Sequence, residues 1–198
     1  MKHAVLILGS LLFVTGIHAQ YGYELGARAG FNLSTQHTTG IASQVETTWK
    51  PGFHIGIFGR LLYTEKMAGQ LEFLYSEKGS LWSEPQYEGE EVVTYVDVPL
   101  TARFQVLNLL NIHAGPQFSF FTGAWRMPEE GIARSVSENY DEVDVGVLLG
   151  AELVLPIKLN IAVRYVEGLI VSTDSRYYPD PWKNRTFQLS LSYAIWGE

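Results

Sequence analysis

Opposite charges recur at the polar positions of several alternating segments of this sequence. The basic and acidic members are Arg28, Arg60, Lys78, Arg103, Arg164, Glu24, Glu72, Asp97, Asp144 and Glu152. A charge taken out of water is costly unless an opposite charge and hydrogen bonds accompany it. We therefore predict a network of buried salt bridges that fills an interior and fixes the register of the segments. Passage of protons or ions along these residues is the less favoured alternative.

Two histidines share those polar positions and raise the question of catalysis. A Ser-His-Asp set could be formed from Ser119, His113 and Asp97, while His54 lies on another segment. No serine has the glycine pattern of a nucleophile elbow around it. His-Glu-x-x-His, EF-hand and phosphate-loop patterns do not occur either. We predict no catalytic residues, no metal site and no cofactor, and a hydrogen-bonding role for both histidines.

The segments that carry these residues alternate like β-strands. Tyr23–Leu33 places apolar residues at every second position and charged, amide or glycine residues between them. Strand side chains alternate with period two, so one face is apolar and the other is polar. A tilted strand of about this length crosses a bilayer. The same pattern recurs in Pro51–Tyr63, Ala68–Gly79, Val92–Gln105, Asn111–Phe121, Val143–Leu155, Lys158–Gly168 and Arg185–Trp196.

The connections between these segments are alternately long and short. The long ones are Ser34–Lys50, Ser80–Glu91, Thr122–Glu142 and Leu169–Asn184, and tight turns lie at Thr64–Lys66, at Leu107–Leu110 and from Pro156. This plan predicts an all-β, eight-stranded antiparallel up-and-down transmembrane β-barrel. Closure removes sheet edges that lipid could not hydrogen-bond. A soluble barrel would turn its apolar face inward, whereas glycines beside bulky charges suit a narrow lumen.

Composition and the first residues bound the remaining possibilities. The chain has 198 residues, 46% hydrophobic and 18% charged, with no cysteine and a formal charge of −7. These values favour one folded domain and oppose disulfides and nucleic-acid binding. Met1–Ala19 has the basic start, the short apolar run and the small final residue of a signal peptide. We predict a signal peptide over residues 1–19, a barrel domain over 20–198, and a monomer in the bacterial outer membrane.

Aromatic residues gather in the predicted long loops. They are Trp82, Trp125, Tyr177, Tyr178 and Trp182. Exposed aromatic rings stack on sugars or anchor a protein partner. The favoured alternative is that they pack on one another or form an aromatic girdle at the lipid interface.

Short motifs spread along the chain resemble one family. They are Gly30–Ser34, Gly52–Gly56, Leu71–Gly79, Tyr95–Leu100, Gly115–Pro116, Arg164–Tyr165 with Gly168–Leu169, and Gln188–Leu191. Together they resemble the PorT-like outer-membrane β-barrel proteins of the Bacteroidetes group. The resemblance implies an eight-stranded barrel with a periplasmic N-terminus; most members have no assigned activity, and one is linked to protein secretion. The chain departs from the usual outer-membrane ending, because Ile195 takes the outward position where the barrel assembly machinery reads an aromatic residue.

These observations favour a non-enzymatic outer-membrane protein with a structural or docking role through long extracellular loops. Its expected partners are outer-membrane lipid, the barrel assembly machinery, and a protein or glycan at the loops. The resemblance adds a link to protein secretion. Two alternatives stay open, a small outer-membrane lipid hydrolase or acyltransferase and a soluble periplasmic lipocalin-like carrier.

Overall fold

A computed structural model describes residues 22–38, 46–84, 87–129, 131–170, 172–173 and 182–197. Its strands are β1 (Tyr23–Thr38), β2 (Glu46–Thr48), β3 (Lys50–Leu62), β4 (Met67–Glu84), β5 (Tyr87–Leu107), β6 (Leu110–Pro128), β7 (Arg134–Ser135), β8 (Val143–Val154), β9 (Leu159–Gly168) and β10 (Trp182–Gly197), with one 3-10 turn, η1 (Ser137–Asn139). The predicted signal peptide lies outside the described residues. Within them, no helix has the length and apolar character needed to span a membrane.

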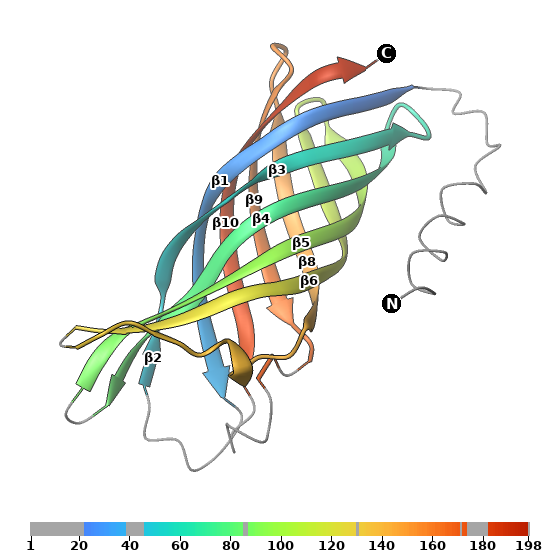
Figure 1. Ribbon diagram of the computed structural model, residues 1–198. Helices are drawn as coiled ribbons and strands as arrows, with labels where there is room; N and C mark the ends of the chain where they lie inside the picture. The colour runs from blue at the N-terminus through green and yellow to red at the C-terminus, as the bar shows by residue number, and fades with distance from the viewer. Residues whose placement is uncertain are drawn as a thin grey trace, which may run out of the picture.

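Eight of these strands form a closed antiparallel ring. The hydrogen-bonded order is β1, β3, β4, β5, β6, β8, β9 and β10, and β10 returns to pair with β1. Tight turns join β3 to β4, β5 to β6 and β8 to β9 at the end of the barrel where β1 begins and β10 finishes (Figure 1). Short turns mark the periplasmic end of an outer-membrane barrel. The predicted eight-stranded up-and-down barrel is confirmed.

The outer face of the barrel wall is apolar and the inner face is polar, as contact with lipid requires. Apolar side chains such as Phe31, Ile57 and Leu149 point outward, and Phe31 keeps 73% of its surface exposed. Charged and amide side chains such as Arg28 and Glu72 point inward and are buried. Because a water-soluble carrier would reverse both faces, this pattern contradicts a lipocalin-like barrel and matches a wall that contacts hydrocarbon.

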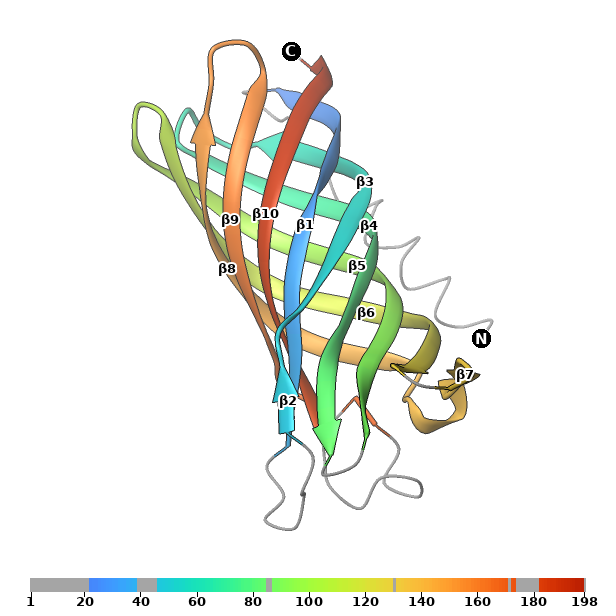
Figure 2. The ribbon, with the colours of Figure 1, turned by 90° about the vertical axis from the view of Figure 1, so that its left-hand side faces the viewer.

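Three strands continue well past the length that a bilayer needs. About 9–11 residues cross the membrane, whereas β4 has 18, β5 has 21 and β6 has 19. Their far ends project from the barrel as a sheet, flanked by β2 beside β4 and by β7 beside β6 (Figure 2). We call this sheet the flap: β2, β7, and residues 80–84 of β4, 87–93 of β5 and 123–128 of β6.

The flap corrects the predicted loop boundaries. Ser80–Glu91 was expected to be a long loop, but most of it continues β4 and β5, and β6 takes the first part of the expected loop Thr122–Glu142. The ladder persists, with Leu81 opposite Glu90 and Glu90 opposite Met127. Outside the membrane a strand no longer needs an apolar face, so hydrogen bonding extends the sheet where hydrophobic alternation fades.

A β-bulge separates the flap from the barrel wall in β6. Thr94 pairs with Gly123 and Tyr95 pairs with Phe121, which leaves Thr122 unpaired. One extra residue inverts the in-out alternation and bends the strand. Beyond the bulge Trp125 therefore faces outward, whereas Ala124 faces inward and is buried.

Candidate functional site

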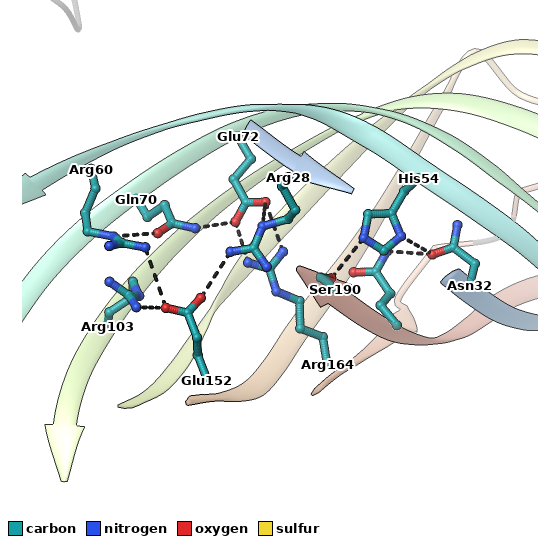
Figure 3. Close-up of polar contacts among 11 residues, drawn as sticks. Arg28, Asn32, His54, Arg60, Gln70, Glu72, Arg103, Glu152, Arg164 and Ser190 are labelled. Atoms are coloured by element: carbon teal, nitrogen blue, oxygen red, sulfur yellow. Dashed lines mark hydrogen bonds and ion pairs between the residues drawn. The ribbon is translucent and has the colours of Figure 1, made fainter. Parts of the chain in front are cut away.

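Charged side chains fill the half of the lumen nearer the periplasm (Figure 3). Glu72 of β4 accepts hydrogen bonds from both terminal nitrogens of Arg164, at 3.0 and 2.5 Å. Arg164 lies in β9, across the barrel from β4. The Nε of Arg28 in β1 lies 3.1 Å from the second oxygen of Glu72. Two guanidinium groups thus share one carboxylate that has no contact with water.

A second glutamate extends the network toward the tight turns. Arg28 Nη2 donates to Glu152 of β8 at 3.1 Å, and Arg103 of β5 forms an ion pair with the other oxygen of Glu152. Arg60 Nη2 lies 3.6 Å from that oxygen, and Arg60 also pairs with Glu24. Side chains from six strands are therefore joined inside the ring.

Neutral side chains complete this cluster. Gln70 accepts from Arg60 Nε at 2.8 Å and donates to Glu72 at 2.6 Å, so it connects the two carboxylate centres. The ring of Phe58 lies under two guanidinium groups, with the Cζ of Arg60 at 5.1 Å from its centroid. Cation–π contact adds to the stabilisation of buried arginines. The sequence interpretation missed Phe58, although it has the same strand parity as His54 and Arg60.

Small residues opposite the arginines make room for them. A Cβ on Gly150 would lie 2.7 Å from His113 Nε2 and 2.9 Å from Arg164 Cγ. Gly56 lies directly opposite Arg28 in the β1–β3 ladder. The alternation of glycine with bulky charge, visible in the sequence, follows from the narrow width of an eight-stranded lumen.

The histidines occupy the lumen but do not form a catalytic set. His54 bonds to Asn32 Oδ1 at 2.7 Å and to Ser190 Oγ at 2.9 Å. His113 is buried, and no hydrogen bond among the described residues joins it to Ser119 or Asp97. The described part of the chain also holds no group of three or more potential ligands placed around a metal. His54 thus has the predicted hydrogen-bonding role, whereas that prediction is wrong for His113, whose two ring nitrogens have no hydrogen-bond partner among the described residues.

Lys78 organises the half of the lumen nearer the flap. Its Nζ donates to Asp97 at 2.8 Å and to Ser119 at 3.2 Å, and it lies 4.8 Å from the centroid of the Tyr95 ring. Asn184 separately donates to Asp144 at 2.7 Å. The predicted network residues therefore divide into two groups, with Lys78 and Asp97 apart from the arginine cluster.

An aromatic plug closes the extracellular mouth. The ring of Tyr140 stacks on Phe121 at 5.4 Å, against the buried Tyr95 and Val93. The Tyr140 hydroxyl donates to Glu91 and lies 3.0 Å from Gln36 Nε2. Burial raises the pKa of the Tyr140 hydroxyl well above its usual range, which keeps the donating proton in place. The plug and the charged cluster together oppose passage of a solute.

The aromatic residues predicted for the loops are spread over three strands. Trp82 faces inward in the β4 part of the flap and is 7% exposed, while Trp125 faces outward in β6 and is 49% exposed. Trp182 begins β10 and is buried opposite Thr38. The expected loop placement of Trp82, Trp125 and Trp182 is wrong, because all three lie in strands, and Tyr177 and Tyr178 lie outside the described residues.

The flap carries two grooves of opposite charge. One, of about 490 Å³, is lined by Glu46, Glu88, Glu90 and Glu129 around Leu81 and Met127. The other, of about 520 Å³, is lined by Arg126, Arg134, Ile132, Val136, Pro128 and Trp82. Arg126 lies 3.9 Å from the centre of the Trp82 ring and directly opposite Arg134 in the β6–β7 ladder. The flap and the residues beside it thus present an acidic and a basic surface.

Comparison with known proteins agrees with this architecture. The family pattern described as outer membrane protein beta-barrel domain matches residues 18–174. The fold is similar to Ail of Yersinia pestis, with 14% identity over 87% of this chain and 97% of that chain and a TM-score of 0.52. It is also similar to Neisserial surface protein A, with 10% identity over 88% and 97% of the chains and a TM-score of 0.52. A comparison with curated proteins finds no match.

Proposed function

Because the chain belongs to the outer membrane protein beta-barrel domain family, we propose that it is a non-enzymatic docking protein whose flap binds a partner outside the cell. The observation that carries this proposal is the continuation of β4, β5 and β6 beyond the bilayer as a hydrogen-bonded sheet. Its bulge and its flanking strands hold two grooves in fixed positions. Charged and aromatic side chains fill the lumen, so the flap is the part of the molecule best placed to bind a partner.

The rigidity of the flap favours binding. A surface held by a strand ladder loses less conformational freedom on association than a loop does. Gly89 allows the Trp82 ring to lie against β5, since a Cβ there would come within 2.9 Å of that ring. Trp82 in turn supports the guanidinium of Arg126. The basic groove is therefore organised before a partner arrives.

The chemistry of the basic groove indicates a partner with acidic groups. Arg126 and Arg134 are cross-strand neighbours, so two positive charges lie side by side in this groove. Glu91 lies at the edge of ion-pair distance from Arg126, at 4.0 Å. Ile132, 82% exposed, adds an apolar contact. Ail was solved in complex with the heparin analogue sucrose octasulfate, so a polyanionic glycan is a suitable first probe here.

Binding of fluorescent heparin fragments and of polyglutamate to intact cells tests this role. Arg134→Glu reverses an exposed charge in the groove and should abolish binding of the preferred probe. Lys183→Glu, at the extracellular end of β10, is the matched control and should retain it. If neither probe binds, or if both variants bind equally, the basic groove is not the docking surface.

The motifs shared with PorT-like proteins support a narrower proposal. We place the chain in that Bacteroidetes-type group, with a signal peptide cleaved after Ala19, folding by the barrel assembly machinery and a monomeric state. A contribution to protein secretion follows from this placement. To test this contribution, the gene is deleted from its host and the secreted proteins are compared with those of the parent strain. Complementation with a copy that carries Arg134→Glu shows whether the flap is involved.

A further inference from the structure

A polar cavity opens at the periplasmic mouth of the barrel, at the end opposite the flap. It has a volume of about 170 Å³, and its polar lining includes Glu24, Arg60, Lys66, Arg103, Asn108 and Asn111. At about 30 Å³ for each water, it has room for about five waters or for one tetrahedral or planar oxyanion. Its size suits a single acid group and excludes a folded partner.

The charge balance around this cavity is positive. The interlocked cluster joins four arginines to Glu24, Glu72 and Glu152, which leaves one positive charge in excess. The adjoining turn contributes Glu65 and Lys66, which cancel. A buried charge without a counterion is strongly unfavourable. Because the rest of the cluster is sealed inside the ring, the cavity is where a counterion can reach it.

Two buried arginines beside the cavity each have an N–H group without a hydrogen-bond partner among the described residues. Arg60 and Arg103 are 5% and 6% exposed, and both line the cavity. Within the described part of the chain, neither Arg60 Nη2 nor Arg103 Nε has a hydrogen-bond partner. Guanidinium groups bind carboxylate and phosphate through paired N–H donors. The amides of Asn108 and Asn111 add further polar groups at the opening.

We propose that the periplasmic mouth binds an oxyanion between Arg60 and Arg103. The ligand is a phosphate or carboxylate group, and it supplies the negative charge that the cluster lacks. Two sources have this chemistry, free phosphate and an acidic side chain of a periplasmic peptide. In the second case the mouth anchors a periplasmic chain to the barrel independently of the flap.

Calorimetric titration of the barrel in maltoside micelles tests the proposal, with inorganic phosphate in one arm and a Gly-Glu-Gly peptide in the other. Arg103→Gln removes a charge-assisted donor and should weaken binding about tenfold or more. Glu24→Gln removes the acid that competes for Arg60 and should tighten binding several-fold. Arg185→Gln, an arginine paired with Glu167 on the outer wall, should leave the affinity unchanged.

The opposite signs of the two lining variants separate binding from misfolding, because a damaged barrel cannot bind more tightly. Circular dichroism and the heat-dependent gel mobility confirm that each variant is folded. If the wild-type barrel binds phosphate more tightly than it binds the peptide, the mouth is a site for a free anion. If it binds the peptide more tightly than phosphate, the mouth anchors a periplasmic chain. The proposal is overturned if neither probe binds at millimolar concentration. It is also overturned if the wild type binds a probe and Glu24→Gln does not bind that probe more tightly.

Discussion

Near the tight turns the lumen is filled by ionised groups, whereas near the flap an aromatic cluster packs among neutral polar side chains. The first half joins Arg28, Arg164 and their partners across the ring. The second half packs Tyr140 against Phe121 and Tyr95 and keeps one central ion pair, between Lys78 and Asp97. Paired charges specify partners and so fix strand register, while stacked rings tolerate small shifts. The paired charges lie where the first and last strands meet the tight turns, and the stacked rings lie beneath the flap.

The largest expected difference between the halves comes from removing one carboxylate in each. Glu72→Leu leaves two buried arginines without their shared partner and should lower the free energy of unfolding by about 3–5 kcal/mol. Asp97→Leu should cost less, because Lys78 keeps Ser119 and the Tyr95 ring. Urea unfolding in lipid vesicles measures both. Equal losses would mean that the two halves are not organised differently.

The wall that both halves share can be tested with two neighbours in β10. Leu189 is exposed on the lipid face and Gln188 is buried in the lumen. Arginine on the lipid face costs about 2–4 kcal/mol near the midplane, so Leu189→Arg should impair refolding into bilayers more than Gln188→Arg. Refolding yield at a series of urea concentrations gives the comparison. A greater defect from Gln188→Arg would contradict the assigned faces.

Glycine substitutions compare how tightly each half is packed. Gly150→Ala places a methyl group 2.7 Å from His113 Nε2 and should destabilise by about 1–3 kcal/mol. Gly123→Ala, beside the bulge, meets only Thr94 Oγ1 at 3.6 Å and should change stability by about 0.5 kcal/mol or less. Thermal or urea midpoints distinguish them. Similar shifts would show that the charged half is no more crowded than the other.

The most local effect should come from the plug. Tyr140→Phe keeps the stacking on Phe121 but removes the hydroxyl between Glu91 and Gln36. The expected loss is about 1 kcal/mol, local to the mouth, with faster amide exchange in residues 131–141. Exchange in β9 should not change. Uniform acceleration across the barrel would mean that the plug stabilises the whole ring.

Alternation in the sequence was sufficient to predict eight strands and which face meets lipid, because both follow from a period of two. It also placed Arg28, Glu72 and Glu152 in the lumen. It could not pair them, since a salt bridge between β1 and β8 depends on ring geometry and not on spacing along the chain. Nor could it follow β5 into the flap, which lies beyond the lipid and no longer needs a continuous apolar outer face. The outward turn of Trp125 was hidden because nothing in its neighbours marks the bulge at Thr122.

Closure of the ring between β1 and β10 has a consequence for the order of events during biogenesis. Arg28 lies opposite Ser192. The first strand, β1, can therefore pair with its second neighbour, β10, only after almost the whole chain has been made. Contacts this distant in sequence form slowly. The pairing of Arg28 with Glu152, 124 residues away, links opposite parts of the nascent wall. The charged cluster therefore connects β1 to β8 and β9, the strands on the far side of β10, and holds the ring together across the strand that closes it.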